Sequence, residues 1–195
     1  MIRYSVILFN FIRYSVILYN YILYTVTVYN VTRCMVIVYN VIRYNIIVYN
    51  VTRCMVIVYN VIRYNIIVYN VIGYNVILCN VTSYIVMVYN VISYNEILYT
   101  VIRSSDILYN VKRYYVILCS VTRCIVIVYN VIRFIVIVYN VICYNVILYN
   151  VTRCIVIALN VIRYIVMVYK LYVITKYYIT LYAPTTYYIK LNVIT

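Results

Sequence analysis

The only acidic side chains of this chain are Glu96 and Asp106, which stand ten residues apart. Two carboxyl groups are the pair that general acid–base chemistry uses, for example in the hydrolysis of glycosidic bonds. The chain has no His, and no other catalytic group accompanies the two carboxyls. We therefore interpret both residues as independent replacements of Val. We predict no enzymatic activity and assign no catalytic residue.

Cysteine is the second residue type that could do chemistry. The number of cysteines is odd, no Cys-x-x-Cys spacing occurs and no His is present, so the sequence has no metal-binding pattern. We assign no metal and no cofactor, and cysteine usage leaves the redox compartment open. The seven residues are Cys34, Cys54, Cys79, Cys119, Cys124, Cys143 and Cys154.

Arginines recur at intervals of ten residues and supply most of the formal net charge of +14. On stacked strands they would lie about 5 Å apart and repel one another unless anions lie between them. Interleaved Tyr rings could stack on bases, but basic charge alone supports only non-specific binding. We do not expect nucleic acid as a specific partner. The arginines are Arg3, Arg13, Arg33, Arg43, Arg53, Arg63, Arg103, Arg113, Arg123, Arg133, Arg153 and Arg163.

Four asparagines, Asn30, Asn50, Asn80 and Asn150, begin Asn-Val-Thr sequons for N-glycosylation. They matter only in a secreted chain. The first residues show no charged region followed by an apolar stretch and a small-residue cleavage site, so we predict no cleaved signal peptide. The localisation stays open.

The elements that must position these side chains form a tandem repeat. Residues 1–170 are seventeen decapeptides with the consensus V-I-R-Y-N-V-I-V-Y-N. The last digit of a residue number gives its repeat position, with 0 standing for position 10. Residues 31–50 and 51–70 are identical, and departures such as Cys34, Thr32 and Glu96 each need one base change. We infer recent duplication of nucleotides under weak selection on the protein.

Residues 171–195 form a second region made of five pentapeptides, which begins L-Y-V-I-T. If V-I-R-Y-N is encoded GTT ATA CGT TAT AAC, the same bases read from the second position give Leu-Tyr-Val-Ile-Thr. Deletion of one base in the preceding Asn codon also produces Lys170. We therefore interpret this tail as the same repeat read in a shifted frame.

The composition favours strands. The chain is 69% hydrophobic, with one Gly and one Pro, and is rich in Val, Ile and Tyr. In a continuous strand, positions 2, 4, 6, 8 and 10 share one face and the odd positions share the other. Asn at position 10 is the recurrent turn former, because Asn tolerates the left-handed conformation. We predict an all-β fold, either irregular or a β-solenoid of ten-residue strands with about twenty residues per coil. Asn and Tyr should then align between coils about 4.8 Å apart.

In its period, this arrangement resembles the pentapeptide-repeat proteins, which form right-handed quadrilateral β-helices with twenty residues per coil. The resemblance implies an inward small residue, then Asp or Asn, then an inward Leu or Phe. Aligning Asn40 with the polar position puts Tyr39 and Val41 at the inward positions, which predicts an overpacked interior. No functional residue is carried over from that family.

Three uncharged stretches, residues 14–32, 64–95 and 134–152, are long enough to span a bilayer. Asn recurs through much of each stretch, and every such amide would need a partner in hydrocarbon. A membrane-associated repeat protein is therefore an alternative interpretation, not the first one.

We interpret the chain as a low-complexity repeat polypeptide without a specific biochemical activity, a translated minisatellite or spurious reading frame. The alternative is a membrane-associated repeat protein. A structural fibre or a weak nucleic-acid binder is a further alternative. The only partner that the pattern itself suggests is another copy, through stacked strands, because long β-branched segments with almost no Pro are prone to associate.

Overall fold

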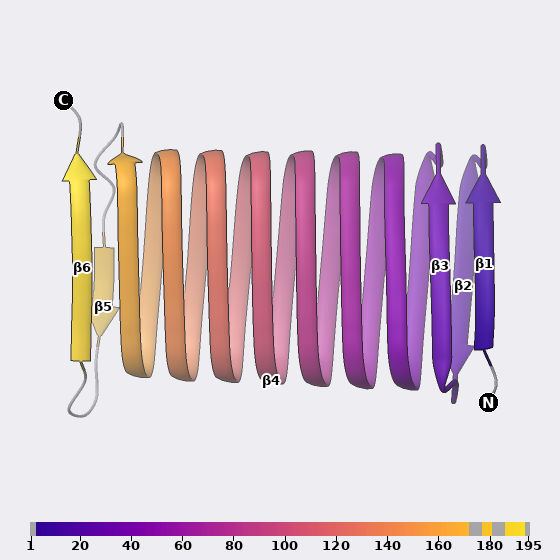
Figure 1. Cartoon of the computed structure of the whole chain (residues 1–195), viewed down its shortest axis with the longest axis horizontal. Helices are drawn as coiled ribbons and strands as arrows, with labels where there is room; N and C mark the ends of the chain where they lie inside the picture. The colour runs from indigo at the N-terminus through magenta and orange to yellow at the C-terminus, as the bar shows by residue number, and fades with distance from the viewer. Residues whose placement is uncertain (1–2, 172–176, 181–185, 194–195) are drawn as a thin grey trace.

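The computed structural model describes residues 3–171, 177–180 and 186–193, and all of its regular structure is strand. The chain winds into a stacked-coil β-solenoid of about eight turns with about twenty residues per turn, which confirms the predicted fold class. The strands are β1 (Arg3–Phe9), β2 (Arg13–Tyr19), β3 (Leu23–Tyr29), β4 (Arg33–Leu171), β5 (Tyr177–Thr180) and β6 (Thr186–Val193). β4 is a continuous ribbon that runs through many coils (Figure 1).

Each coil has two faces that lie front and back in Figure 1 and join at an upper and a lower edge. Strands of one face pair in parallel with the strand twenty residues later. Arg3 pairs with Leu23, and Arg13 pairs with Arg33. The chain rises on the front face, falls on the back face and advances as a right-handed coil, the hand that parallel crossovers adopt.

The coil turns at repeat position 10. Every residue there from Asn10 to Asn160 has a positive φ between 50° and 57°. Asn reaches this left-handed region more readily than most residues because its short polar side chain bonds locally. Only one position in ten takes this conformation, so a coil of about twenty residues has two corners and two faces. The quadrilateral cross-section implied by the pentapeptide-repeat resemblance does not form.

The two edges differ in their asparagine ladders. On the Asn10 edge, the corners at residues 10, 30 and onward to 150 are all Asn, and each amide Nδ2 donates to the Oδ1 of the preceding coil at 2.9–3.2 Å. On the Asn20 edge, the corners run from residue 20 to residue 160. There the ladder joins Asn20 to Asn80 and Asn140 to Asn160, and Thr100 and Ser120 interrupt it.

The interior is built from repeat positions 1, 4, 6 and 8. Val41, Tyr44, Ile46 and Val48 show the pattern, with 1% exposure or less. The strict alternation predicted from sequence is therefore wrong at the corners: position 2 is exposed, as at Ile42, and position 1 is buried. The left-handed residue at position 10 turns the chain, so the period-two phase is not carried across it.

The Tyr side chain at position 9 lies on the outer surface of the solenoid. Tyr39 stacks on Tyr19 at 4.8 Å and on Tyr59 at 5.0 Å, so the predicted inward placement of Tyr39 and the overpacking that followed from it are wrong. On the Asn10 edge, rings stack without interruption from Phe9 to Tyr169, with centroids 4.6–5.0 Å apart. The predicted alignment of Asn and Tyr between coils is confirmed.

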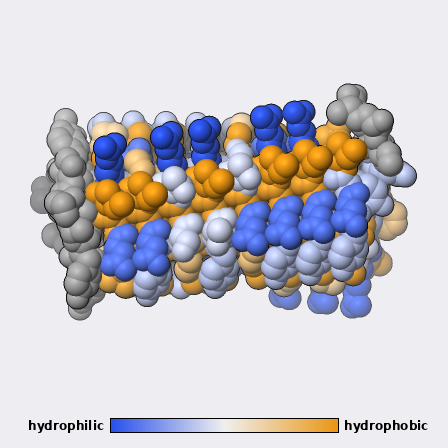
Figure 2. Space-filling model, turned by 90° about the horizontal axis from the view of Figure 1, so that it is seen from below, coloured by the Kyte–Doolittle hydropathy of each residue, from blue (hydrophilic) through white to orange (hydrophobic). Residues whose placement is uncertain are grey.

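Exposed isoleucines form most of a row beside the corners of the Asn20 edge. Figure 2 views the Asn20 edge, where a hydrophobic row runs between hydrophilic rows along the solenoid. Members of that row include Ile42, Ile62, Ile102 and Ile142, which are 43–49% exposed. Their neighbours along the chain include Arg43, Arg63 and Arg103. Burial therefore ends at position 1, and position 2 is left as an apolar surface.

The tail departs from the twenty-residue register. β5 pairs with β4 through Val156 and Tyr177, and β6 pairs with β4 through Arg163 and Thr186, with an irregularity after Tyr169. Tail strands therefore add to the end of the stack with a shifted spacing. Residues 172–176, 181–185 and 194–195 of the tail lie outside the described residues, and the shifted reading frame stays a prediction.

We expect the double substitution Thr100→Asn and Ser120→Asn to stabilise the solenoid. Both residues hold a positive φ, which Asn tolerates better than Ser or the β-branched Thr, and two Asn side chains would complete the amide ladder between Asn80 and Asn140. Each change should add about 1 kcal/mol to the free energy of unfolding, measured by denaturant titration.

Thr32→Asn serves as the matched control, because Thr32 is also exposed but lies at position 2 with no positive φ. This change should leave the free energy of unfolding within about 0.5 kcal/mol. An equal effect of Thr32→Asn would contradict the assignment of the gain to the corner.

Candidate functional site

The interior of the solenoid contains one polar cluster. Glu96 and Asp106 are 0% and 1% exposed, and Ser104 is 2% exposed. Position 6 is an interior position, and ten residues carry the chain from one face of a coil to the other. The structure therefore brings together two carboxyls that sequence reasoning treated as independent replacements.

Hydroxyl groups satisfy most of the cluster. Tyr94 donates to Glu96 Oε2 at 3.1 Å, and Ser104 donates to Asp106 Oδ1 at 3.3 Å. The Tyr114 hydroxyl lies 3.1 Å from Asp106 Oδ2 and 3.4 Å from Glu96 Oε2, so its single proton serves one carboxyl at a time. Such bonds offset part of the cost of burying carboxyl groups.

Ser104 is the residue that sequence reasoning missed. It occupies position 4, which carries a large Tyr in most repeats, and its small side chain leaves room for the carboxyls. The signal was present in the sequence, because Ser104 stands two residues before Asp106 and residues at that spacing share a strand face. The two tyrosines that bond the carboxyls, Tyr94 and Tyr114, stand ten residues before and ten residues after Ser104.

Burial sets the protonation of the cluster. Removal from water raises the pKa of Glu96 well above its usual range, and the nearby Asp106 raises it further. Burial raises the pKa of Asp106 to about 7, against the opposing effect of hydrogen bonds from Tyr114 and Ser104. The pair therefore holds a proton near neutral pH. Both side chains are enclosed, so the cluster offers no surface to a substrate and acts on the stability of the fold.

Other interior hydroxyl groups lower the stability of the fold. Within the described residues, the hydroxyl oxygens of Tyr44, Tyr64 and Tyr74 have no hydrogen-bond partner. Burial raises the pKa of each of these phenols well above its usual value. An unpartnered buried polar group typically costs about 1–3 kcal/mol. Stacking of the rings offsets this cost in part, as between Tyr44 and Tyr64 at 5.2 Å.

The cysteines are dispersed over the interior and the faces, and all seven are free thiols. Cys34 and Cys54 lie in the interior of successive coils, and burial, followed by the proximity of Cys34, raises the pKa of the Cys54 thiol well above its usual value. In the described part of the chain, no three His, Cys, Asp or Glu side chains gather into a group that could hold a metal ion.

The sequon asparagines lie at corners. Asn30, Asn50 and Asn150 belong to the ladder of the Asn10 edge, and Asn80 belongs to that of the Asn20 edge. Each side-chain amide bonds a neighbouring coil, so attachment of a glycan to the same nitrogen would compete with the ladder.

The uncharged stretches 14–32, 64–95 and 134–152 form coils of the solenoid. Across the residues that the structure describes, no helix is long and apolar enough to cross a membrane. Membrane association stays a prediction from hydropathy.

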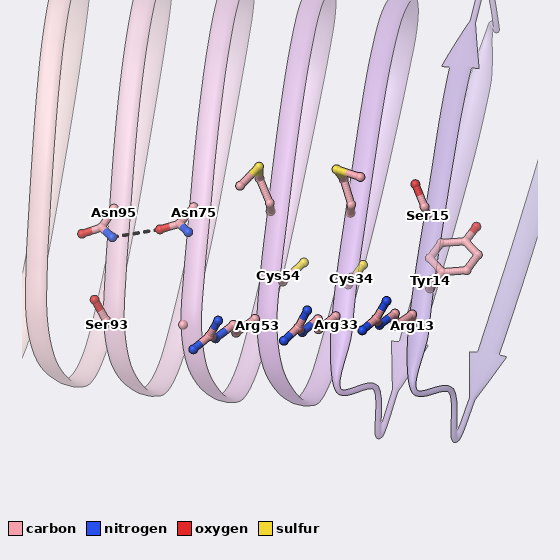
Figure 3. Close-up of a pocket in the computed structure, with 13 residues that line it drawn as sticks. Arg13, Tyr14, Ser15, Arg33, Cys34, Arg53, Cys54, Asn75, Ser93 and Asn95 are labelled. Atoms are coloured by element: carbon pink, nitrogen blue, oxygen red, sulfur yellow. Dashed lines mark hydrogen bonds between the residues drawn. The ribbon is translucent and has the colours of Figure 1, made fainter.

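The arginines at position 3 lie on the outer surface, just after the corners. On the Asn10 edge, Arg13, Arg33 and Arg53 stand in a row and line a groove of about 710 Å³ (Figure 3). The position-9 tyrosines of the same edge stack on one another. Both faces of each interior ring of that stack are therefore covered, and the predicted stacking of bases between tyrosines has no free ring face there.

Comparison with known proteins adds no relative. No family model, curated protein sequence or solved structure matches this chain. Function must therefore be argued from the geometry of the solenoid, its ends and its surface.

We expect the free energy of unfolding to fall as the pH rises from about 4 through 7. The raised pKa values of Glu96 and Asp106 mean that the folded state keeps protons that the unfolded chain releases above about pH 4. Stability is fully present below the unfolded pKa and is lost as the pH rises, by about 1.4 kcal/mol per unit for each carboxyl that stays protonated. Denaturant titrations across this range measure the slope.

The double substitution Glu96→Val and Asp106→Val restores the consensus residue and should flatten this dependence, because the chain has no His and no other acidic side chain. Ser104→Ala keeps both carboxyls and should keep the slope. A wild-type chain that gains stability between pH 4 and 7 would show that the pair is ionised in the folded state.

Proposed function

We propose that this chain has no catalytic activity and is a structural repeat polypeptide whose solenoids associate end to end. The observation that carries the proposal is the outer edge of the first described coil. Within the residues that the structure describes, β1 and β2 stand at the ends of the strand order, with β1 paired to β3 and β2 paired to β4. Their outer edges carry backbone groups that a further coil would pair with.

The side chains of the first coil agree with this assignment. Tyr4 is 50% exposed, whereas the equivalent Tyr44 is fully buried, and Phe9 and Phe11 are 58% and 46% exposed. Stable solenoids usually end in a repeat with a polar outer face, and this coil has the same apolar interior positions as the others. Within the described residues, the side chains at this end are therefore less covered than those of the middle coils.

A second copy of the chain is the partner that fits this end. On the Asn10 edge, each coil of the array offers the next one the same corner amide and ring face. Asn10 Oδ1 accepts from Asn30, and among the described residues the Asn10 Nδ2 has no partner in the ladder. The Phe9 ring stacks on Tyr29 with one face, and its other face is the outer end of this ring stack. Another coil of this repeat would continue both ladders.

The origin of the array supports a structural role without a selected activity. Identical copies at residues 31–50 and 51–70, and single-base departures elsewhere, indicate that nucleotide duplication produced the regularity. The solenoid results because a ten-residue period with Asn at its end places the same side chains inside every coil. We infer a translated minisatellite or spurious reading frame.

This origin makes a prediction about the gene. Bases encoding residues 171–195 should match the array read from the second base of its repeat, and mass spectrometry of the source cells should decide whether the peptide is made. Varied synonymous codons in the array, together with an unrelated tail sequence, would overturn the nucleotide origin and point to selection on the protein.

End-to-end association predicts an effect of charge on the first coil. Tyr4→Lys with Val6→Lys places two charges at interior positions of the open end, where they would have to be buried on stacking. Wild-type protein should form oligomers that grow with concentration in sedimentation velocity, and this variant should sediment mainly as a monomer with an unchanged β-sheet circular dichroism spectrum.

Ile7→Lys with Ile17→Lys is the matched control. It adds the same charge to the same coil at positions that face solvent, since these isoleucines are 61% and 55% exposed. The control should associate as the wild type does. Equal loss of association in both variants would assign it to net charge, and unchanged association of the Tyr4 and Val6 variant would exclude this end as the interface.

A further inference from the structure

The groove on the Asn10 edge has one strongly basic wall. Arg13 pairs in register with Arg33, and the backbone N–H groups of Arg33 and Arg53 donate to Ile12 and Thr32 of the preceding coil at 3.0 Å each. The three arginines therefore occupy equivalent places on successive strands, which lie about 4.8 Å apart. Figure 3 shows their guanidinium groups in a row near the corner.

The rest of the groove is lined by a mixture of apolar and polar side chains, with Tyr14, Cys34 and Cys54 between the two walls. Gly73 and Ser93 take the place of Arg in the next two coils, and Asn75 and Asn95 stand across the groove, joined by a hydrogen bond of 2.8 Å. Ser15, Met35 and Met55 continue that opposite wall. Small residues at the position of Arg thus open the groove toward the middle of the solenoid.

No side-chain carboxylate balances this row of charges. The two acidic residues of the chain, Glu96 and Asp106, are buried in the interior and bonded to hydroxyl groups. Three like charges at the spacing of adjacent strands repel one another, and the repulsion is relieved when anions lie along the row. A ligand with regularly spaced anionic groups should bind most tightly, because each anionic group can lie beside one guanidinium.

We propose that this groove binds a run of phosphate groups on a linear polyanion. Guanidinium groups bind phosphate oxygens through paired N–H donors, and the Asn and Ser side chains beyond them supply further polar contacts. We assign recognition to the phosphate groups, because the position-9 tyrosines of this edge cover one another's ring faces and Tyr14 is the one aromatic side chain among the residues that line the groove. Inorganic polyphosphate and the backbone of a single-stranded oligonucleotide share this chemistry.

A second arginine row provides an internal comparison. Arg113, Arg133 and Arg153 occupy the same repeat position on the same edge. At position 5 of these coils stand Tyr115, Ile135 and Ile155, in place of Ser15, Met35 and Met55 beside the first row. Charge is therefore matched between the two rows, while the side chains of the opposite wall differ.

Fluorescence anisotropy with labelled polyphosphate and labelled oligothymidylate of equal phosphate number tests the proposal. Arg33→Gln should weaken the binding of each ligand that the wild type binds by about tenfold and lower the slope of log K against log salt by about one. Arg133→Gln removes the same charge and should change the affinity less than about twofold at the same salt concentration. Circular dichroism verifies that both exposed substitutions leave the fold intact.

Gly73→Arg gives a gain-of-function test. The φ of Gly73 is not positive, and an added Cβ would meet only the Thr52 carbonyl oxygen at 3.8 Å, an ordinary contact. This substitution extends the row to four arginines and should tighten binding about tenfold, with a steeper salt dependence.

Binding of polyphosphate alone would identify a free phosphate chain as the ligand, and equal binding of both would identify any phosphate backbone of suitable spacing. Either result supports the groove if Arg33→Gln and Arg133→Gln differ as expected. An equal loss of affinity in the two variants would show that binding depends on net charge alone, and the proposed site would be wrong. Absence of binding by both labelled ligands, or no gain with Gly73→Arg, would overturn it as well.

Discussion

The left-handed residue at every tenth position is the constraint on which the rest of this structure depends. It makes one corner in each decapeptide, and each coil has two corners. The coil therefore has twenty residues, and this register aligns each side chain with its equivalent in the next coil. Asn suits the position twice over, because its backbone tolerates the positive φ and its side-chain amide bonds the next corner. Thr100 and Ser120 keep the backbone conformation without the ladder of the Asn20 edge, so the fold of the neighbouring coils holds the corner in place.

Exact repetition then decides how each interaction is used. A ring, an amide or a guanidinium in most coils meets its own kind in the next coil, which is favourable for stacked tyrosines and hydrogen-bonded asparagines and unfavourable for arginines. Apolar positions inside the coil form a continuous core, whereas the arginines outside form rows of uncompensated charge. The properties of the surface and of the two ends therefore follow from the same periodicity that stabilises the interior.

The polar cluster around Asp106 shows what the interior tolerates. Two carboxyls replaced Val in adjacent repeats, and they coexist because they lie together, accept hydrogen bonds from hydroxyl groups and hold a proton. Tyr94 donates to Glu96 and Ser104 to Asp106, and the Tyr114 hydroxyl lies within reach of both carboxyls. Enclosure makes the cluster a determinant of pH-dependent stability, whereas the basic groove lies on the outer surface.

The amino-acid sequence by itself determined the strands, the twenty-residue coil and the corner at position 10, because β-branched composition, a ten-residue period and a recurrent Asn are local properties. It also determined that Asn and Tyr would align between coils. Only the tertiary structure decided that position 1 and the Tyr of position 4 lie inside, while the Ile of position 2 and the Tyr of position 9 lie outside, because the corner interrupts the alternation that a straight strand would keep. It alone brought Glu96 to Asp106 and Ser104 and gave the first arginine row its groove, since residues ten and twenty apart become neighbours only once the chain has coiled.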